Sequence, residues 1–524
     1  MKNTILFGLD GATFTVLDPL MRDGIMPHLR AFASLGVRAE LLSTPHPVTP
    51  PAWTTVMTGR GPGQHGIFDF VRPEEGKTGI YLKVTDSRDN RSETIWSIAS
   101  RQNRRVAALN FYGMSPPRPL AGYSIPGFVP ARHMRRGSHP ADLFERLARH
   151  GLDGKRLGMD LDQEKKAIQG FAPELCADWI RTHIRREQQW FETLRFIMQT
   201  DPCDLTAIVF DGVDKIQHLC WRMLDPALAD SAIGPVETEV RRLCLEYFRQ
   251  IDAFLGEVVR LAGTDADIFI VSDHGFCAST EIVYINTWLA EQGFLRWSPD
   301  APVDTGEGLM AQRMKTHTGL LDWSGTRAYA LTPSSNGIFI RGVAPDAYGR
   351  YRQTVIEALE RLRDPATGES IVTRIFTREE AFPGDRMRLA PDLTIALRDH
   401  GLVSILRGSA PVQRRSGPVG THHPAGVFLA AGPTMRRGVT LPAIPLIDVA
   451  PTLLYSVGLP VPEDLEGAVV RAAFLPEALR AHPVQAGAPT IPPGAFAASP
   501  DEFELDAREE QEVMDRLKSL GYLD

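Results

Sequence analysis

Short apolar runs, each bounded by polar residues, recur along the chain. They are five or six residues long, which suits buried strands better than helices. Continuous apolar runs of this kind are typical of parallel strands that are covered on both faces. The runs are residues 4–9, 106–111, 205–210, 267–272, 393–397 and 427–431.

Amphipathic patterns with a helical period lie between these runs. Two of them stop at Gly36 and Gly458, and glycine just past the last turn commonly ends a helix. Strands that alternate with helices predict an α/β fold, with a central, mainly parallel sheet and helices on both faces. The helical stretches are residues 26–35, 93–102, 237–261, 347–362 and 448–457.

Two stretches interrupt the alternation. Residues 130–200 are polar, basic and helical, whereas residues 296–390 mix Gly, Pro and short strands. We expect both to be insertions, placed to cap a site, in one domain formed by residues 1–475. Residues 476–524 then form a linker and a C-terminal amphipathic helix, with Val513, Leu517 and Leu520 on one face.

Composition and charge narrow the class of protein. With 43% hydrophobic residues among 524, the chain can bury a large core. Lys and Arg number 57 and Asp and Glu 64, so the net charge of −7 argues against a nucleic-acid polymer as partner but permits a small anionic substrate. No apolar run is long enough to span a membrane. Five scattered cysteines without a CxxC pair predict a reducing, cytoplasmic compartment. The oligomeric state cannot be read from the sequence.

Aspartate and histidine gather where the predicted strands end. In open α/β sheets, ligands bind beyond the carboxyl ends of the strands. Carboxylates and imidazoles without thiolates suit zinc, or a manganese-like ion, in an open catalytic site. These side chains are numerous enough for two ions, although each pair alone would also suit a helix cap and a packed histidine. They are Asp10, Asp211, Asp214, His218, Asp273, His274, His422 and His423.

Thr49 is the candidate nucleophile. It precedes Pro50 and Pro51, and Thr followed by Pro predicts a helix with Thr49 as its N-cap, ending near Gly59. Backbone N–H groups and the dipole at such an end favour a phosphoryl anion. A plain helix cap is the alternative interpretation, and Thr44, Thr54 and Thr55 are competing hydroxyls, the last two inside the helix.

Taken together, these motifs resemble the type I phosphodiesterase/nucleotide pyrophosphatase family of the alkaline phosphatase superfamily. The order and spacing of the motifs carry the resemblance, and it implies an alkaline-phosphatase-like fold. The matching stretches are residues 5–11, 49–59, 62–67, 214–218, 271–275, 420–428 and 448–454.

The resemblance implies a site with two metal ions, usually zinc. Thr49 would be the nucleophile between them, forming a phospho-threonine that water then hydrolyses. Asp214 rather than Asp211, and His422 rather than His423, match the family's motifs. One ion would be held by Asp10, Thr49, Asp273 and His274, and the other by Asp214, His218 and His422.

The chain also departs from the family's pattern. Nucleotide pyrophosphatases carry an Asn near the nucleophile that donates to a phosphoryl oxygen, but here Ala52 stands three residues after Thr49, with no Asn nearby. Backbone N–H groups at the helix start, or Asn110, are the substitutes to consider. No CxPxR-like motif is present, which argues against a formylglycine sulfatase.

The first functional hypothesis is therefore a metal-dependent hydrolase of a small phosphorylated substrate. We expect a phosphodiesterase, with a phosphomonoesterase as the alternative. A phosphotransferase or mutase would share Thr49 and the metals and differ in the acceptor. A non-catalytic binding protein on the same fold is the third hypothesis, and it would be expected to have lost at least one ligand.

Overall fold

The computed structural model is centred on one large sheet. The structure describes residues 3–76, 79–129, 131–158, 173–228, 234–301, 303, 318–494, 510–511 and 513–514. Nine strands follow the order β17-β2-β16-β8-β1-β7-β5-β6, with β18 also beside β2. They are β1 (Asn3–Leu9), β2 (Val37–Leu42), β5 (Val106–Phe111), β6 (Gly122–Pro126), β7 (Leu205–Phe210), β8 (Ala266–Val271), β16 (Ala425–Ala431), β17 (Val439–Thr440) and β18 (Ile444–Pro445).

The central sheet is mainly parallel, as predicted. Strand β1 pairs in parallel with β7 and β8, and β5 with β6 and β7. Strand β16 runs antiparallel to both of its neighbours, β2 and β8. The start of β16 therefore lies at the same edge as the carboxyl ends of the other strands, and this edge carries the candidate site.

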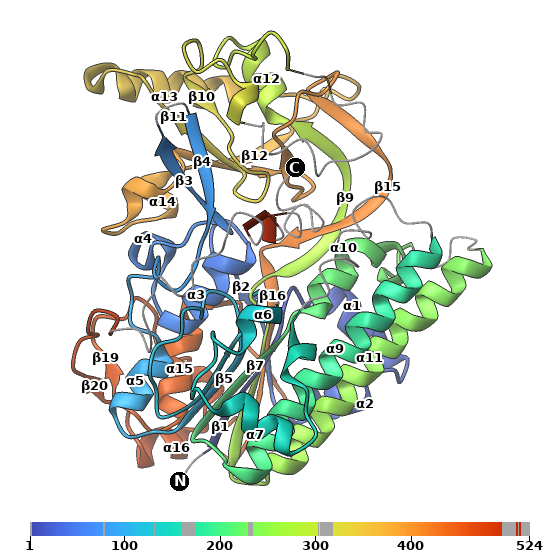
Figure 1. Ribbon diagram of the computed structural model, residues 1–524, viewed down its shortest axis with the longest axis vertical. Helices are drawn as coiled ribbons and strands as arrows, with labels where there is room; N and C mark the ends of the chain where they lie inside the picture. The colour runs from blue at the N-terminus through green and yellow to red at the C-terminus, as the bar shows by residue number, and fades with distance from the viewer. Residues whose placement is uncertain are drawn as a thin grey trace.

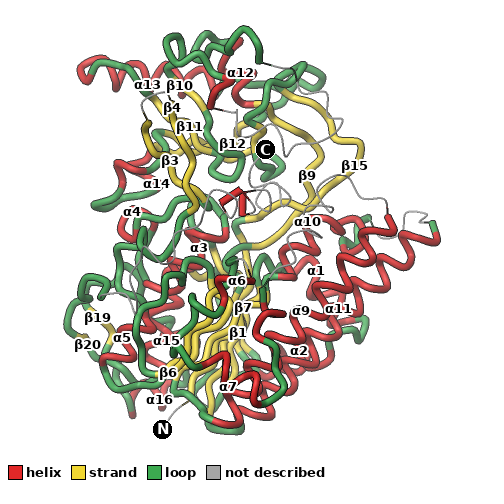
Figure 2. Tube along the Cα trace, in the orientation of Figure 1, coloured by secondary structure: helices red, strands yellow, loops and turns green. Residues whose placement is uncertain are grey.

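Helices cover both faces of the sheet (Figures 1 and 2). One face packs against a layer of helices, in which Phe191 of α9 stacks on Phe254 of α11 with ring centres 4.2 Å apart. These helices include α1 (Phe14–Arg22), α2 (Pro27–Leu35), α7 (Leu143–Arg149), α9 (Pro173–Thr200), α10 (Gly212–Leu224) and α11 (Pro235–Ala262). The other face packs against α3 (Thr49–Thr58), α5 (Ile95–Arg101) and α15 (Val449–Ser456).

The described end of the first expected insertion packs against the sheet. The end of that stretch, α9, buries Trp190 and Leu194 in the core of the sheet's helical face and lies beside α11 (Figure 1). A polar helix with one apolar stripe suits that place as well as a cap, and the sequence pattern alone does not separate the two. Residues 159–172 of this insertion lie outside the described residues.

The second insertion is larger than predicted and begins earlier. Strands β9 (Gly275–Tyr284) and β15 (Val412–His423) leave and re-enter the core as a long antiparallel pair, shown at the top right of Figure 1. Between them lie α12 (Ile285–Glu291), α13 (Pro345–Leu359) and a second sheet, which we call the outer unit. That sheet has the order β10-β11-β13-β12. Its strands are β10 (Ala328–Tyr329), β11 (Gly337–Ile340), β12 (Val372–Thr377) and β13 (Leu393–Leu397).

One predicted strand therefore belongs to a different sheet. Residues 393–397 form β13, which pairs antiparallel with β11 and β12 rather than joining the central sheet. Both positions bury an apolar run, so the run by itself does not say which sheet it enters. Residues 304–317 of the outer unit lie outside the described residues.

The C-terminal region is described in part. Residues 484–494 are described and include the short strand β20 (Ala486–Gly487). Residues 510, 511, 513 and 514 are helical. Of the three residues on the predicted apolar face, Val513 is described and is buried. Leu517 and Leu520 lie outside the described residues. Within the described part of the chain, no helix combines the length and the apolar character needed to cross a membrane.

Candidate active site and metal centre

The side chains at the carboxyl edge of the sheet form two groups. In the first, His274 Nε2 lies 3.6 Å from Asp10 Oδ1 and 3.4 Å from Asp273 Oδ2. Asp10 follows β1, and Asp273 and His274 follow β8, so two neighbouring parallel strands deliver the group. All three side chains are buried, and their ligand atoms lie within 4.8 Å of one another.

The second group joins α10 to the strand pair that re-enters the core. Asp214 Oδ1 lies 3.4 Å from His218 Nε2 and 3.2 Å from His422 Nε2, and the two ring nitrogens are 3.0 Å apart. Asp214 and His218 share one face of α10, as their spacing predicts. The two groups adjoin, because His274 Nε2 is 4.0 Å from Asp214 Oδ1.

His422 and His274, where the two groups meet, each use the ring nitrogen Nδ1 in a hydrogen bond to a backbone carbonyl. His422 Nδ1 donates to the carbonyl oxygen of Pro47 at 2.6 Å, and His274 Nδ1 donates to that of Gly275 at 3.1 Å. Each bond places the ring proton on Nδ1 and leaves the Nε2 lone pair facing the carboxylates. Metal-binding histidines are commonly oriented in this way.

One oxygen of each carboxylate in the first group lacks the hydrogen bond that burial normally requires. Asp10 Oδ1 and Asp273 Oδ2 are fully buried, and neither has a hydrogen-bond partner in the described part of the chain. Burial, together with the neighbouring carboxylates, raises the pKa of Asp10 well above its usual range, and burial raises the pKa of Asp273 to about 8. A divalent cation would satisfy both oxygens and hold the carboxylates ionised, so the residues fit a metal.

Thr49 lies beside the first group. Its Oγ1 is 3.5 Å from His274 Nε2, and the side chain is buried. The loop after β2 brings it there, because the carboxyl end of β2 lies at the same edge as that of β8. Thr49 is the first residue of α3, and Val48 is the N-cap, so the predicted helix start was wrong by one residue.

The start of α3 offers fewer N–H donors than the sequence predicted. Pro50 and Pro51 occupy the second and third positions and have no N–H, and Ala52 N donates to Val48 O at 3.1 Å. Only the N–H of Thr49 is left at this end. The expectation of a helix N-terminus rich in phosphoryl donors is therefore wrong for this chain.

Asn110 is not the substitute donor. Its side-chain nitrogen donates to Val209 O at 2.7 Å and to Asp211 Oδ1 at 3.2 Å, which uses both amide hydrogens. Asp211 also accepts from Arg186 at 2.6 Å and pairs with Lys215. Asp211 thus belongs to a buried ionic cluster beneath α10, whereas Asp214 faces the two histidines.

The competing residues are engaged elsewhere. The hydroxyls of Thr54 and Thr55 bond back to Pro50 O and Pro51 O at 2.7 and 2.9 Å, as expected inside a helix. Thr44 donates to the carbonyl oxygen of its near neighbour His46 at 2.6 Å. His423 packs edge-on against His400 and lies outside both groups.

Two residues that the sequence analysis passed over connect this site to the outer unit. His46 is buried three residues before Thr49, and its Nε2 bonds to the carbonyl oxygen of Ser334. Asp69, beyond α3, accepts from the hydroxyls of Thr332 at 2.5 Å and Ser334 at 2.6 Å. Their partners lie more than 260 residues away in the chain, so no local signal could have found them.

The burial of these two residues shifts their pKa values. Burial, and secondarily the charge of His422, lowers the pKa of His46 to about 3, so its ring is neutral and its Nε2–H donates. Burial raises the pKa of Asp69 to about 6, against the hydrogen bonds from Ser334 and Thr332 that stabilise its charged form.

The comparisons with known proteins agree with this fold. The family model for type I phosphodiesterase / nucleotide pyrophosphatase matches residues 4–425. The chain belongs to this family, a member of the alkaline phosphatase superfamily. A comparison with curated protein sequences gives no match.

Several solved structures share the fold at low sequence identity. Murine ectonucleotide pyrophosphatase/phosphodiesterase 5 is 14% identical, covers 88% of this chain and 96% of its own, and has a TM-score of 0.50. An inactive threonine-to-alanine form of that protein, in complex with AMP, is 13% identical with the same coverage and TM-score. Phosphonoacetate hydrolase from Sinorhizobium meliloti, in complex with phosphonoformate, is 16% identical, covers 87% and 95%, and has a TM-score of 0.52.

Proposed function

We propose that this protein is a metal-dependent hydrolase of phosphate esters that acts on diesters. The observation that carries the proposal is the pair of adjoining carboxylate–imidazole groups with Thr49 Oγ1 at their border, 3.5 Å from His274 Nε2. The ligands named in the murine and bacterial structures, AMP and phosphonoformate, carry a phosphoryl or phosphonyl group.

Asp10, Asp273, His274 and Thr49 would hold one divalent cation, and Asp214, His218 and His422 the other. When bound, two such cations, zinc or manganese, supply Lewis acidity toward the phosphoryl oxygens and lower the pKa of a bound hydroxyl. This contribution matters more than usual here, because the start of α3 has few N–H groups to offer the phosphoryl oxygens.

The chemistry of the chain's own residues then follows in two displacements. The Thr49 hydroxyl loses its proton as Oγ1 attacks phosphorus, the bond from phosphorus to the leaving oxygen breaks, that oxygen takes up a proton and departs as an alcohol, and the rest of the ester stays bonded to Thr49. Water next attacks phosphorus and loses a proton, the bond to Thr49 Oγ1 breaks, Thr49 regains its proton, and a phosphate monoester leaves. Forming a covalent intermediate splits one difficult step into two easier ones.

The nucleophile is tested by substitution at Thr49. Thr49→Ala should lose more than about 100-fold in turnover while keeping its fold and most of its metal, because water can replace one hydroxyl ligand. Thr49→Ser should keep appreciable activity, since only a methyl group is removed. Thr54→Ala and Thr55→Ala are matched controls on the same helix and should stay active.

The measurements separate the alternatives. Turnover of bis(p-nitrophenyl) phosphate against p-nitrophenyl phosphate distinguishes a diesterase from a monoesterase. Rapid quench with a phosphorus-labelled diester should trap label on the peptide that contains Thr49. Label on Thr44 or Thr54, or near wild-type turnover in Thr49→Ala, would contradict the assignment. A metal content below one ion per chain, with no hydrolysis after zinc or manganese is added, would instead favour a non-catalytic binding protein.

A further inference from the structure

A cavity, which we call the seam cavity, lies where the outer unit meets the core. Its core side is formed by the loop after α4 (Pro62–His65) and by the antiparallel pair β3 (Val71–Gly76) and β4 (Gly79–Val84), which lie beside the outer unit in Figure 1. Its volume is about 270 Å³, whereas an apolar cavity of about 150 Å³ in another protein accommodates benzene. A ligand larger than one aromatic ring therefore fits between the two parts of the molecule.

The walls of the seam cavity are largely apolar. Phe68 meets Phe382 edge to face at 5.3 Å, and Phe339 stacks on Tyr329 with ring centres 5.8 Å apart. The two rings that line the cavity, Phe68 and Phe339, are therefore held in place and offer a rigid surface to an apolar group. The apolar lining includes Phe68, Val71, Leu82, Leu331, Phe339 and Leu389.

The carboxylates of the lining are already engaged. Asp69 accepts from the hydroxyls of Thr332 and Ser334, and Asp89 pairs with Arg72 at 2.9 Å. The bonds of Asp69 cross from the core to the outer unit, so the cavity lies directly beside contacts that hold the two together. The remaining charges of the lining are those of two further arginines.

These two arginines, one from each side of the seam, are fixed to the same short helix. Arg91 N donates to His65 O at 2.9 Å, and Arg386 N, in the outer unit, donates to Gly63 O at 2.8 Å. A Cβ at Gly63 would collide with the backbone of Pro383, so the outer unit docks on α4 at close range. Both arginines line the cavity, and within the described residues neither guanidinium has an ion-pair or hydrogen-bond partner.

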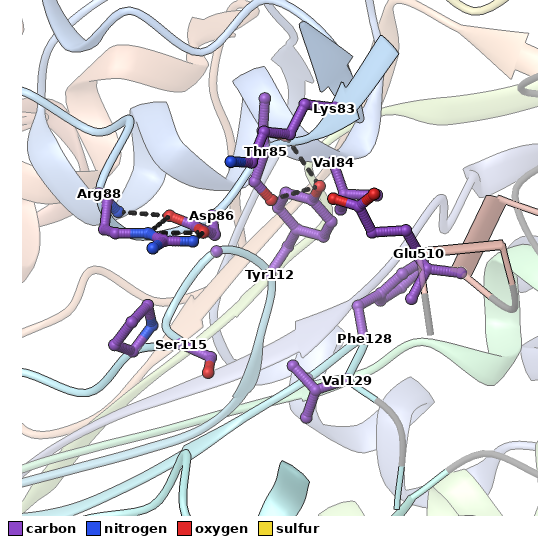
Figure 3. Close-up of a pocket in the computed structure, with 14 residues that line it drawn as sticks. Lys83, Val84, Thr85, Asp86, Arg88, Tyr112, Ser115, Phe128, Val129 and Glu510 are labelled. Atoms are coloured by element: carbon purple, nitrogen blue, oxygen red, sulfur yellow. Dashed lines mark hydrogen bonds and ion pairs between the residues drawn. The ribbon is translucent and has the colours of Figure 1, made fainter. Parts of the chain in front are cut away.

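A neighbouring arginine shows the satisfied arrangement. Figure 3 shows Arg88 with its guanidinium on Asp86, and the closest atoms of the two are 2.6 Å apart. Arg88 lines the adjacent cavity drawn there and not the seam cavity. Arg91 and Arg386 differ from it, because no carboxylate of the described residues is paired with either. Two such guanidinium groups, one on each side of a seam, suit an oxyanion that accepts hydrogen bonds from both.

We propose that the seam cavity binds a small organic anion, and that this ligand fastens the outer unit to the core. Its oxyanion head accepts hydrogen bonds from Arg91 and Arg386, because guanidinium forks match the oxygens of carboxylates and phosphates. Its apolar body lies between Phe68 of the core and Phe339 of the outer unit. The site is separate from the two metal groups, since its lining contains none of their residues, and it does not depend on the proposed diesterase function.

Three small probes separate the head of the ligand from its body. The anion 2-naphthoate carries both, 2-naphthamide keeps the rings without the charge, and acetate keeps the charge without the rings. Isothermal titration of the full-length, metal-loaded protein should show 2-naphthoate bound about tenfold or more tighter than either of the others, since a charge-assisted hydrogen bond and a buried ring system each contribute at least that much. It should also raise the melting temperature, because a ligand that binds only the folded state stabilises it.

Substitutions test whether the two arginines hold the head. Arg91→Gln and Arg386→Gln should each weaken the binding of 2-naphthoate about tenfold and leave the weak binding of 2-naphthamide unchanged, because each removes one charged donor. Arg88→Gln and Arg388→Gln are matched controls close by in the chain. Neither Arg88 nor Arg388 lines the seam cavity, so these variants should bind both probes like the wild type.

Carboxylates also bind metal ions, so the titration is repeated after dialysis against EDTA. The affinity for 2-naphthoate should not change, whereas loss of binding together with the metal would place the anion at the metal centre and overturn the proposal. Equal affinity in the wild type and both arginine variants, or no binding to the wild type, would also refute it. Affinity and melting temperature are measured without turnover, so a failure of this site and a failure of the proposed hydrolysis are distinguishable.

Discussion

The side chain of Asp273, in the first group, is anchored to the backbone. Its Oδ1 accepts from Gly11 N at 3.1 Å, and its Oδ2 faces His274. Asp273→Ala should lower the metal content of the purified protein and cut turnover by more than about 100-fold, the upper end of what loss of an outer-shell partner costs. Elemental analysis and diester turnover, measured on the same sample, check this.

The control for that prediction is His423→Ala. His423 packs on His400 outside both groups, so its loss should leave metal content and turnover close to wild-type values. If His423→Ala loses metal and His422→Ala keeps it, the wrong member of the pair has been placed in the site.

His46 is a positioning residue rather than a catalytic one. It holds the loop before Thr49 to Ser334, and the next residue, Pro47, accepts from His422. His46→Leu removes the donor and should lower kcat about tenfold with KM and metal content nearly unchanged, since small misplacements of reacting groups are costly. His46→Gln keeps a donor for Ser334 O and should recover part of the lost kcat. Equal losses in both variants would reduce His46 to a packing residue.

At the scale of elements, Asp69 makes the attachment of the outer unit sensitive to pH. Its pKa is about 6 in the folded protein against 3.8 for the free side chain, so the folded state binds more protons between pH 4 and pH 6. Stability from this group is therefore greatest below pH 4 and falls as pH rises through 6. An asparagine at this position cannot titrate. The melting temperature of Asp69→Asn minus that of the wild type should therefore increase as pH rises from 4 to 6.

Thermal unfolding across that pH range is the measurement, with chelator present throughout to remove any effect of metal. Asp392→Asn is a control within the outer unit, because Asp392 is also buried but its partners, Tyr348, Ile340 and the ion-paired Arg378, all lie in that unit. A constant difference in melting temperature between wild type and Asp69→Asn would show that Asp69 is already ionised in the folded protein at pH 4.

The sequence predicts the elements of the core better than their relations in space. Apolar runs located β1, β5, β7 and β8, and polar residues at their ends located both groups, because a parallel sheet brings carboxyl ends to one edge. The same apolar signal misassigned β13 to the central sheet. The turn that contains Thr332 and Ser334 escaped notice, because its bonds to Asp69 and His46 exist only after the outer unit has docked.

At the scale of the whole molecule, removing metal should destabilise the protein as well as inactivate it. Exhaustive dialysis against EDTA should abolish diester hydrolysis, and zinc or manganese should restore it. Cations that bind only the folded state would also raise its stability, by about 2.7 kcal/mol at a hundredfold excess over Kd. Full activity after chelation would contradict the two-metal site.

The chelated protein should show its own pH dependence. Asp273 has a pKa of about 8 when folded and 3.8 when free, and Asp10 is raised as well, so the folded state holds extra protons between pH 4 and pH 8. Stability without metal should therefore fall as pH rises through this range. Saturating zinc should flatten the curve, because a bound dication replaces the protons. Identical curves with and without zinc would show that no ion binds these carboxylates.

The strand pair β9 and β15 joins the outer unit to the core and holds the two metal-site histidines at a fixed spacing. Five consecutive pairs, from Gly275 opposite His423 to Ser279 opposite Val419, adjoin the core, and the register shifts between Val419 and Arg414 farther out. His274 and His422 stand at the inner end of this ladder, one from each group. Bending or rotation of the outer unit at the register shift would leave the inner pairs, and hence the spacing of the two imidazoles, undisturbed. The spacing of the two imidazoles is thus insulated from motion of the outer unit beyond that shift, and the unit acts on the site instead through Ser334, which holds the loop before Thr49 by way of His46.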